Sequence, residues 1–183
     1  MVENIKFNLI CGLDNKNEIF KKFKLIFLDT FNQDYKKDVF NWKYSNQTEP
    51  FSLHLLQQYI NQQQQDIFEV KQKRFVIADE QKNALGFVDL FDFEPLHRRL
   101  GVGLFVRAEF RNKGVGKQAL GLLNRYAEKQ LNIKSMYANI AIENTPSIRL
   151  FESLGYRKVG HKKDWNFYDG IFHDEFLYQK QLS

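Results

Sequence analysis

The sequence predicts an α/β (α+β) fold in which a mixed, mostly antiparallel sheet of about six to seven strands is flanked by helices. Three strand-like segments follow one another between residues 74 and 106, which indicates an antiparallel meander. From residue 100 to residue 142 a strand, a glycine-containing loop, an amphipathic helix and another strand succeed one another, and such a crossover makes its two strands parallel. Near the end, Asp169 and Gly170 separate two further strand-like segments and are typical of a tight hairpin turn.

The first third of the chain is predicted to be mainly helical. Residues 5–10 alternate weakly between apolar and polar and indicate a first strand. Residues 15–44 carry apolar side chains at helical spacing, Pro50 interrupts this pattern, and residues 53–66 predict a second helix.

The remaining two thirds predict strands over residues 74–78, 84–93, 100–106 and 135–142, with a helix over residues 117–131. A shorter helix of about ten residues follows the last of these strands. We expect Thr145 to cap this helix, Pro146 to lie in its first turn and Gly155 to end it in a left-handed conformation.

Composition narrows the class of protein. With 43% hydrophobic and 27% charged residues in 183, the chain resembles an ordinary globular domain and predicts a single one. One cysteine, Cys11, excludes an intramolecular disulfide and favours a cytoplasmic setting. No apolar run reaches the roughly 18 residues that a membrane helix needs, so we expect neither membrane insertion nor secretion. The net charge of +5 allows an anionic partner.

The loop at residues 111–117 is the strongest functional signal. It lies between a predicted strand and a predicted helix, where free backbone N–H groups and the positive end of the helix favour an anion such as pyrophosphate. Gly114 and Gly116 would let the backbone approach the phosphates, and Arg111, Lys113 and Lys117 supply positive charge.

Two well-known phosphate loops do not fit this segment. The nucleoside-triphosphate loop needs glycine where Arg111 stands and serine or threonine where Gln118 stands. The dinucleotide fingerprint that begins at Gly101 lacks its third glycine, because Val106 occupies that position. The histidines and aspartates of residues 161–174 lack zinc-ligand spacing, and the basic residues form no nucleic-acid motif, so we expect no metal and no nucleic-acid partner.

Two blocks resemble the GNAT superfamily of N-acetyltransferases. Residues 106–116 read VRAEFRNKGVG and resemble its acetyl-CoA loop, and residues 144–156 read NTPSIRLFESLGY and resemble its short helix that ends in glycine and an aromatic residue. Residues 42–46 (WKYSN) and 168–174 are similar to the branch with ribosomal-protein alpha-amino, spermidine and aminosugar acetyltransferases. The resemblance implies one domain, with residues 1–72 as an acceptor-side helical part and residues 73–183 as the acetyl-CoA-binding core.

The resemblance also implies a splayed parallel strand pair that admits acetyl-CoA, the implied cosubstrate. A backbone N–H near Val106 would then polarise the thioester carbonyl. The implied cofactor contacts are Leu104, Phe105, Val106, Arg111, Asn112, Lys113, Gly114, Val115, Gly116, Lys117, Asn144 and Phe151. Trp42, Tyr44 and Asp89 are the implied acceptor contacts.

The chain departs from the family where the acid and the base are usual. Many members carry a glutamate at the position of Gly101 and a tyrosine at that of Phe151. Asp92, Glu94 and His97 are therefore our candidates for the base, with Asp89 nearby, and Ser147 is our candidate for the acid.

The predicted function is transfer of an acetyl group from acetyl-CoA to a primary amine by direct attack in a ternary complex. The acceptor stays open between a small-molecule amine, an aminosugar and a protein N-terminus. An alternative is a non-catalytic acyl-CoA-binding or regulatory module that has lost its acid and base. A homodimer is compatible with the phenylalanine-rich first 70 residues.

Overall fold

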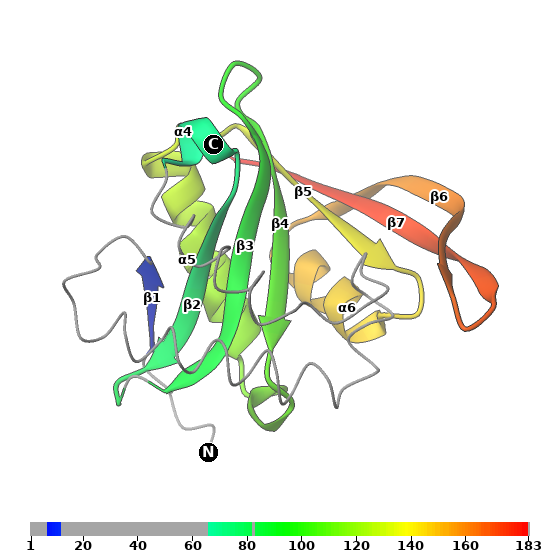
Figure 1. Cartoon of the computed structure of the whole chain (residues 1–183), viewed down its shortest axis with the longest axis horizontal. Helices are drawn as coiled ribbons and strands as arrows, with labels where there is room; N and C mark the ends of the chain where they lie inside the picture. The colour runs from blue at the N-terminus through cyan, green and yellow to red at the C-terminus, as the bar shows by residue number, and fades with distance from the viewer. Residues whose placement is uncertain (1–6, 12–65, 82, 183) are drawn as a thin grey trace.

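The computed structural model describes residues 7–11, 66–81 and 83–182. They form one sheet of seven strands in the order β1-β2-β3-β4-β5-β7-β6 (Figure 1). This confirms the predicted fold class and places every predicted strand within a few residues. The helix predicted at residues 15–44, with Trp42 and Tyr44, and all but the last residue of the helix predicted at residues 53–66 lie outside the described residues. The strands are β1 (Phe7–Cys11), β2 (Lys73–Asp79), β3 (Ala84–Glu94), β4 (Arg99–Val106), β5 (Ser135–Ala141), β6 (Arg157–Tyr168) and β7 (Ile171–Gln181).

The first four strands form the expected antiparallel meander. Strands that follow one another in the chain pair antiparallel in the sheet: β1 with β2, β2 with β3 and β3 with β4. Strand β5 then pairs parallel to β4, and β7 pairs antiparallel to β5, so that β6 forms the far edge. The single parallel pair therefore joins a four-stranded half to a three-stranded half.

Helix α5 (Val115–Lys129) makes the crossover between the two parallel strands and supplies much of the core. Its buried residues recur at helical spacing, so one face of the helix packs on the sheet. The buried core that it shares with β2 to β5 consists of Phe75, Ile77, Leu85, Val88, Leu90, Leu100, Val102, Val115, Ala119, Leu120, Leu123, Ala127 and Met136, among others.

The two short helices show how local capping sets helix ends. In α4 (Ile67–Val70), the side chain of Asp66 accepts a hydrogen bond from the N–H of Phe68. In α6 (Thr145–Ser153) the cap is Asn144, one residue before the predicted Thr145, because the Asn144 Oδ1 accepts from the N–H of Ser147. Pro146 lies in the first turn of α6 and Gly155 follows its end with φ +84°, as the sequence predicts.

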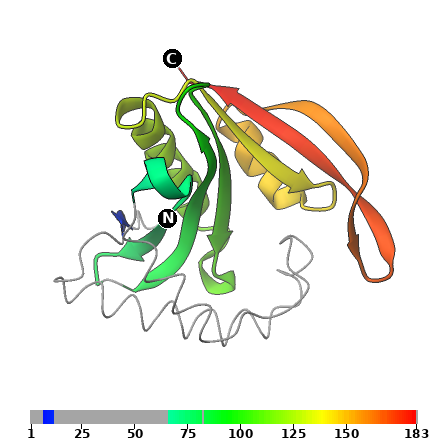
Figure 2. The ribbon, with the colours of Figure 1, turned by 45° about the horizontal axis from the view of Figure 1, so that its top comes forward.

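The C-terminal hairpin confirms the predicted turn. Asp169 and Gly170 join β6 to β7 with φ angles of +52° and +78°, the left-handed pair that a two-residue hairpin turn requires. The far end of the hairpin extends beyond α6, away from β1 to β4 (Figure 2). No helix in the described part of the chain combines the length and the apolar character that a membrane crossing requires.

Candidate functional site

The two parallel strands stay together only at one end. Strands β4 and β5 pair through three pairs of opposed residues, and the last pair is Gly101 with Tyr137. Beyond that point, among the residues that the structure describes, residues 102–106 of β4 pair only with β3, and residues 138–141 of β5 pair only with β7. We call the Gly101–Tyr137 pair the fork. Past the fork, no strand of the described residues lies between the two strand edges, and an extended ligand with amide groups could bond to both edges.

The loop at residues 111–117 leads from the open end of β4 into α5. Gly114 is the N-cap of α5 at φ +80°, and Asn112 is also left-handed at φ +60°. The first intrahelical hydrogen bond runs from the N–H of Gln118 to the carbonyl of Gly114, so the N–H groups of residues 115–117 lie in the turn that intrahelical bonds do not satisfy.

Local chemistry leaves this helix end suited to an anion. Gly114 has no side chain with which to cap the helix, and the first turn of α5 holds no acidic residue. Asn112, Lys113 and Lys117 are exposed beside it. By contrast, the start of α6 is already bonded by its own Asn144. The free amides and the positive end of the helix dipole together fit a pyrophosphate.

Arg111 and Gly116 tie this loop to β4. The Nε of Arg111 donates to the carbonyl oxygen of Val106 at 2.9 Å. A Cβ at position 116 would lie 3.0 Å from a methyl carbon of Leu104 and 3.1 Å from one of Leu150. Gly116 therefore allows α5 to pack closely against β4 and α6, whereas Gly114 is required for its left-handed backbone.

The residues predicted around the thioester lie on both faces of the sheet. Leu104 and Val106 face α5, since both lie within 4 Å of a Cβ at position 116. Phe105 lies on the opposite face and stacks on Phe87, with ring centroids 5.0 Å apart. Phe151 is buried in the core, 4% exposed, with its ring edge-on to Tyr156.

The hydroxyl groups near Phe151 differ in their freedom to act as an acid. Tyr156 is fully buried and hydrogen-bonds to Asn124, and burial raises the pKa of Tyr156. Ser147 is partly exposed in the first turn of α6. Of these two hydroxyl groups, that of Ser147 is the one that a ligand between the strands could reach.

The acidic candidates occupy different surroundings on the face opposite α5. Asp89 is held by Arg74 through both of its carboxylate oxygens, with Nη2 to Oδ2 at 2.6 Å, so its charge is balanced within the protein. Asp92 is exposed at a bulge of β3 with φ +48°, and its Oδ2 accepts from the hydroxyl of Tyr137 at 2.6 Å. Asp89 and Asp92 therefore lie on either side of the Phe91–Gly101 register.

Glu94 and His97 lie farther from the open end. In the strand register, Glu94 lies opposite Arg99, where β4 begins, and His97 is exposed in the turn between β3 and β4. Because β4 runs from this turn towards residue 106, both residues are at its paired end. Of the predicted bases, Asp92 is thus the one whose hydrogen bond links it to a residue of the fork.

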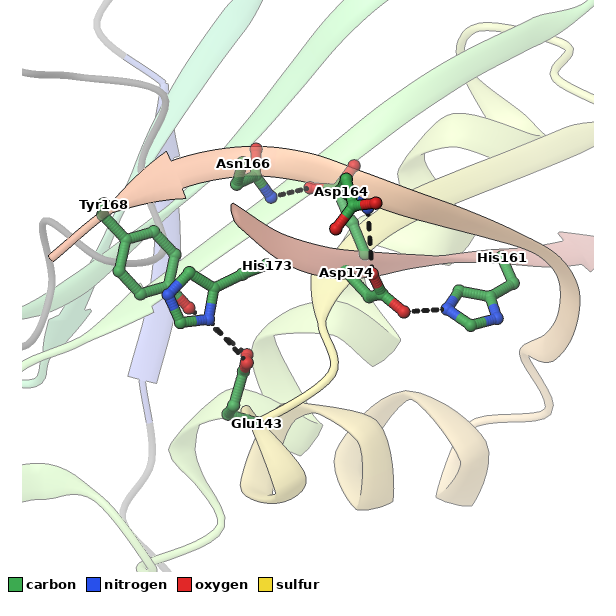
Figure 3. A network of polar contacts seen from close by, with 8 residues as sticks. Glu143, His161, Asp164, Asn166, Tyr168, His173 and Asp174 are labelled. Carbon is green, nitrogen blue, oxygen red and sulfur yellow. Dashed lines mark hydrogen bonds and ion pairs between the residues drawn. The ribbon is translucent and has the colours of Figure 1, made fainter. Parts of the chain in front are cut away.

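The half of the β6–β7 hairpin that lies nearer the turn holds a polar network (Figure 3). His173 Nδ1 lies 2.9 Å from Glu143 Oε1, and the hydroxyl of Tyr168 donates to the same carboxylate at 3.3 Å. Although burial opposes it, the hydrogen bond from His173 lowers the pKa of Glu143. Nearby, Asp174 accepts from the N–H of Asp164 and bonds to His161. Within the described residues, no group of three or more His, Cys, Asp or Glu side chains is arranged to hold a metal ion.

Sequence reasoning missed the polar side chains of β5 and their partners. The prediction used the apolar face of β5 and ignored the alternate residues Tyr137 and Asn139. Lys162 Nζ donates to both Asn139 Oδ1 and Glu175 Oε1, each at 2.9 Å. The alternation of apolar and polar residues along β5 was a usable signal. Because successive side chains point to opposite faces of a sheet, Tyr137 and Asn139 had to lie on the face opposite the core.

Comparison with known proteins agrees with this geometry. Residues 26–157 match the family model described as the acetyltransferase (GNAT) domain, which is more than two thirds of the chain. A spermidine N(1)-acetyltransferase of Vibrio cholerae is 29% identical over 103 residues, which are 56% of this chain and 60% of that protein. The putative ribosomal N-acetyltransferase YdaF of Bacillus subtilis is 26% identical over 93 residues, 51% of each chain. This chain thus aligns with less than two thirds of either relative.

Solved structures agree over nearly the full length. A spermidine N-acetyltransferase from Vibrio cholerae in complex with CoA and spermine superposes with a TM-score of 0.78 at 23% identity, covering 96% of this chain and 95% of that one. A dodecameric structure of the Vibrio cholerae spermidine enzyme gives a TM-score of 0.70 at 22% identity, covering 97% and 93%. The resemblance of the two sequence blocks is confirmed: the chain belongs to the GNAT acetyltransferase family.

Proposed function

We propose that this protein transfers an acetyl group from acetyl-CoA to a primary amine. The observation that carries the proposal is the combination of two diverging parallel strands with an uncapped helix N-terminus at the open end of one of them. The family match supports the same activity.

In the proposed complex, the diphosphate of acetyl-CoA binds the N–H groups at the start of α5, with Asn112, Lys113 and Lys117 around it. The pantetheine arm extends between β4 and β5 towards the fork, past Asn144 and the N-terminus of α6. The amine attacks the thioester carbonyl carbon directly, so holding both substrates in line supplies much of the rate. A backbone N–H on the open edge of β4 stabilises the developing oxyanion. Departing CoA thiolate is protonated by Ser147 or by solvent.

The acceptor in this proposal is a cationic small-molecule amine, with polyamines first. Two observations support this choice. Several relatives are named spermidine N(1)-acetyltransferases. Asp92 offers an exposed carboxylate beside the fork, on the face opposite α5. In the same proposal residues 1–72 form the acceptor side, with Trp42 and Tyr44, and residues 73–183 bind the cofactor, in a protein of the cytoplasm.

Release of CoA thiol from acetyl-CoA in the presence of an amine panel tests this function. The panel contains spermidine, spermine, an aminosugar phosphate and a short peptide with a free N-terminus, and mass spectrometry identifies the acetylated product. We expect turnover with the polyamines well above the rate without an amine. Turnover only with the aminosugar or the peptide would change the acceptor and keep the reaction.

A non-catalytic acyl-CoA-binding module is the second candidate. The glycine at 101 and the buried Phe151 favour it, because neither residue can transfer a proton. This candidate predicts that acetyl-CoA binds while no amine in the panel releases thiol. Absence of both binding and turnover would contradict both functions.

We also propose that the protein self-associates through the outer face of the hairpin tip, as a homodimer or a larger assembly. Trp165, Phe167 and Phe172 are each more than half exposed there, and the rings of Phe167 and Phe172 lie together across the two strands. Exposed aromatic side chains gathered near one turn are unusual unless a partner covers them. A structurally similar relative is described as dodecameric, which supports a second copy of this chain as that partner.

Light scattering after gel filtration tests the assembly. We expect the unmodified protein to elute as an oligomer, and Phe167→Ser to shift it to the monomer mass, because the substitution removes the ring at the centre of the aromatic set. Val159→Ser, an exposed apolar position at the other end of β6, is the matched control and should leave the mass unchanged. A monomer at every concentration would contradict the proposal.

A further inference from the structure

We infer that Asp92 is the proton-accepting carboxylate of the reaction and that Tyr137 is the positioning residue that holds it at the fork. This inference rests on the proposed acetyltransferase function and names the group that carries its proton transfer.

Three residues lie side by side across the sheet at the fork. Phe91 of β3 pairs with Gly101 of β4, and Gly101 pairs with Tyr137 of β5. Directly opposed residues share a face of the sheet, and β3 and β5 are two strand spacings apart, about 10 Å. Gly101 contributes no side chain, so the side chains of the outer strands can meet above it.

The space above Gly101 is filled from both sides. A Cβ at position 101 would overlap the ring of Phe91, so any other residue here would displace that ring. The ring of Tyr137 meets the ring of Phe91 edge-on, with centroids 5.7 Å apart. The tyrosine hydroxyl reaches past it to the carboxylate of Asp92 at 2.6 Å. A side chain of β5 and one of β3 are thereby joined across β4.

The bulge in β3 makes this meeting possible. The register between β3 and β4 shifts between Phe91 and Glu94, and Asp92 adopts φ +48° within that shift. An extra residue in one strand redirects its side chains, and bulges are frequent beside active sites. Asp92 is exposed, so an acceptor amine or a water can contact the oxygen that the tyrosine leaves available.

The surrounding charges suit a carboxylate that acts as a base. Asp89, on the other side of Phe91, already has its charge balanced by Arg74. Arg99 at the start of β4 favours ionisation of Tyr137, but burial and the hydrogen bond to Asp92 outweigh it and raise the pKa of Tyr137. The phenol therefore stays protonated at neutral pH and donates to Asp92. The guanidinium of Arg98 is engaged by Asn132, through Nε to the backbone carbonyl at 2.8 Å and Nη2 to Oδ1 at 2.6 Å.

Asp92 takes the first of the two protons that the acceptor nitrogen loses. The acceptor arrives as an ammonium ion and gives one proton to the Asp92 carboxylate, leaving a neutral amine and a carboxylic acid. The nitrogen lone pair then forms the bond to the thioester carbon, and the carbon–sulfur bond breaks with its electron pair on the CoA thiolate. The nitrogen loses its second proton to solvent, and the thiolate gains one.

Asp92→Asn is the decisive variant, because asparagine tolerates the same left-handed backbone and keeps the size of the side chain. With spermidine or whichever amine the unmodified protein accepts, we expect kcat/KM at pH 7 to fall about 100-fold. The Kd for acetyl-CoA should stay within about twofold, because Asp92 is remote from the phosphate loop. The remaining rate should rise about tenfold per pH unit, since only pre-deprotonated amine would react. Glu80→Gln, an exposed carboxylate in the turn between β2 and β3, is the control.

Tyr137→Phe removes only the hydroxyl. We expect about a tenfold fall in kcat with an unchanged melting temperature, and no further fall when it is combined with Asp92→Asn. A carboxylate supplied from β4 should rescue the loss: Gly101→Glu together with Phe91→Ala, in the Asp92→Asn background, should regain at least about tenfold and flatten the pH profile.

The outcomes separate the two levels of the proposal. No turnover by the unmodified protein with any amine overturns the proposed function, and this inference with it. Turnover that Asp92→Asn leaves unchanged in rate and pH profile overturns the role of Asp92 alone. A Tyr137→Phe variant with the full rate, or one whose loss simply multiplies that of Asp92→Asn, overturns the positioning role.

Discussion

Replacing Gly114 by glutamate is expected to weaken acetyl-CoA binding by at least about 100-fold, which corresponds to about 2.7 kcal/mol. Gly114 is the N-cap of α5 at φ +80°, next to the unsatisfied amides that we propose for the pyrophosphate. A glutamate there adds bulk, negative charge and a carboxylate that can cap the helix itself. Titration calorimetry with acetyl-CoA measures the effect, and the unmodified protein should bind in the micromolar range.

The hairpin turn supplies a matched control for this substitution. Gly170 has φ +78° and no atom within 4 Å of its missing Cβ, so Gly170→Glu carries similar backbone strain and the same charge far from α5. It should leave acetyl-CoA binding unchanged. Equal weakening by both variants would show that strain or net charge, and not the loop, controls binding.

Replacing Gly86, the one glycine of β3, by valine should strongly destabilise the folded protein. A Cβ at position 86 would overlap the carbonyl oxygen of Phe105 in the neighbouring strand β4, and a backbone oxygen in a paired strand cannot move aside cheaply. Overpacking of this kind costs about 1–3 kcal/mol or more. Denaturant unfolding should show a lower midpoint, and because the strain falls beside Val106, acetyl-CoA binding should weaken as well.

Gly121→Ala tests the same reasoning in the opposite direction. Gly121 lies within α5 and has nothing within 4 Å of its missing Cβ. Alanine in an open helical position should raise stability by about 0.4–1 kcal/mol through the unfolded chain. If Gly86→Val unfolds at the same denaturant concentration as the unmodified protein, or Gly121→Ala is strongly destabilised, the packing described for β4 and α5 is contradicted.

Features set by neighbouring residues were predictable from the sequence. The Asp169–Gly170 turn and the end of α6 at Gly155 depend on left-handed backbone, which few residue types adopt readily, so a local pattern identifies them. The N-cap of α6 is Asn144, one residue before the predicted Thr145. Both residue types are good caps, and only the hydrogen bond from the N–H of Ser147 selects between them.

Features that join distant segments were not predictable in the same way. The hydrogen bond between Asp92 and Tyr137 spans 45 residues and depends on a bulge in β3 and a glycine in β4. The ion pair of Arg74 with Asp89 depends on strand register. An aromatic residue at position 151 reads equally well as a core residue and as a cofactor contact, and burial against Tyr156 is seen only in the folded chain.

Hydrogen exchange of the backbone amides, with and without acetyl-CoA, tests most directly whether the cofactor lies between β4 and β5. We expect added protection at two places, the start of α5 at residues 115–117 and the unpaired edges at residues 102–106 and 138–141. The hairpin amides near Gly170 should exchange at the same rate in both samples. Protection confined to the hairpin, or none at saturating acetyl-CoA, would contradict the proposed site.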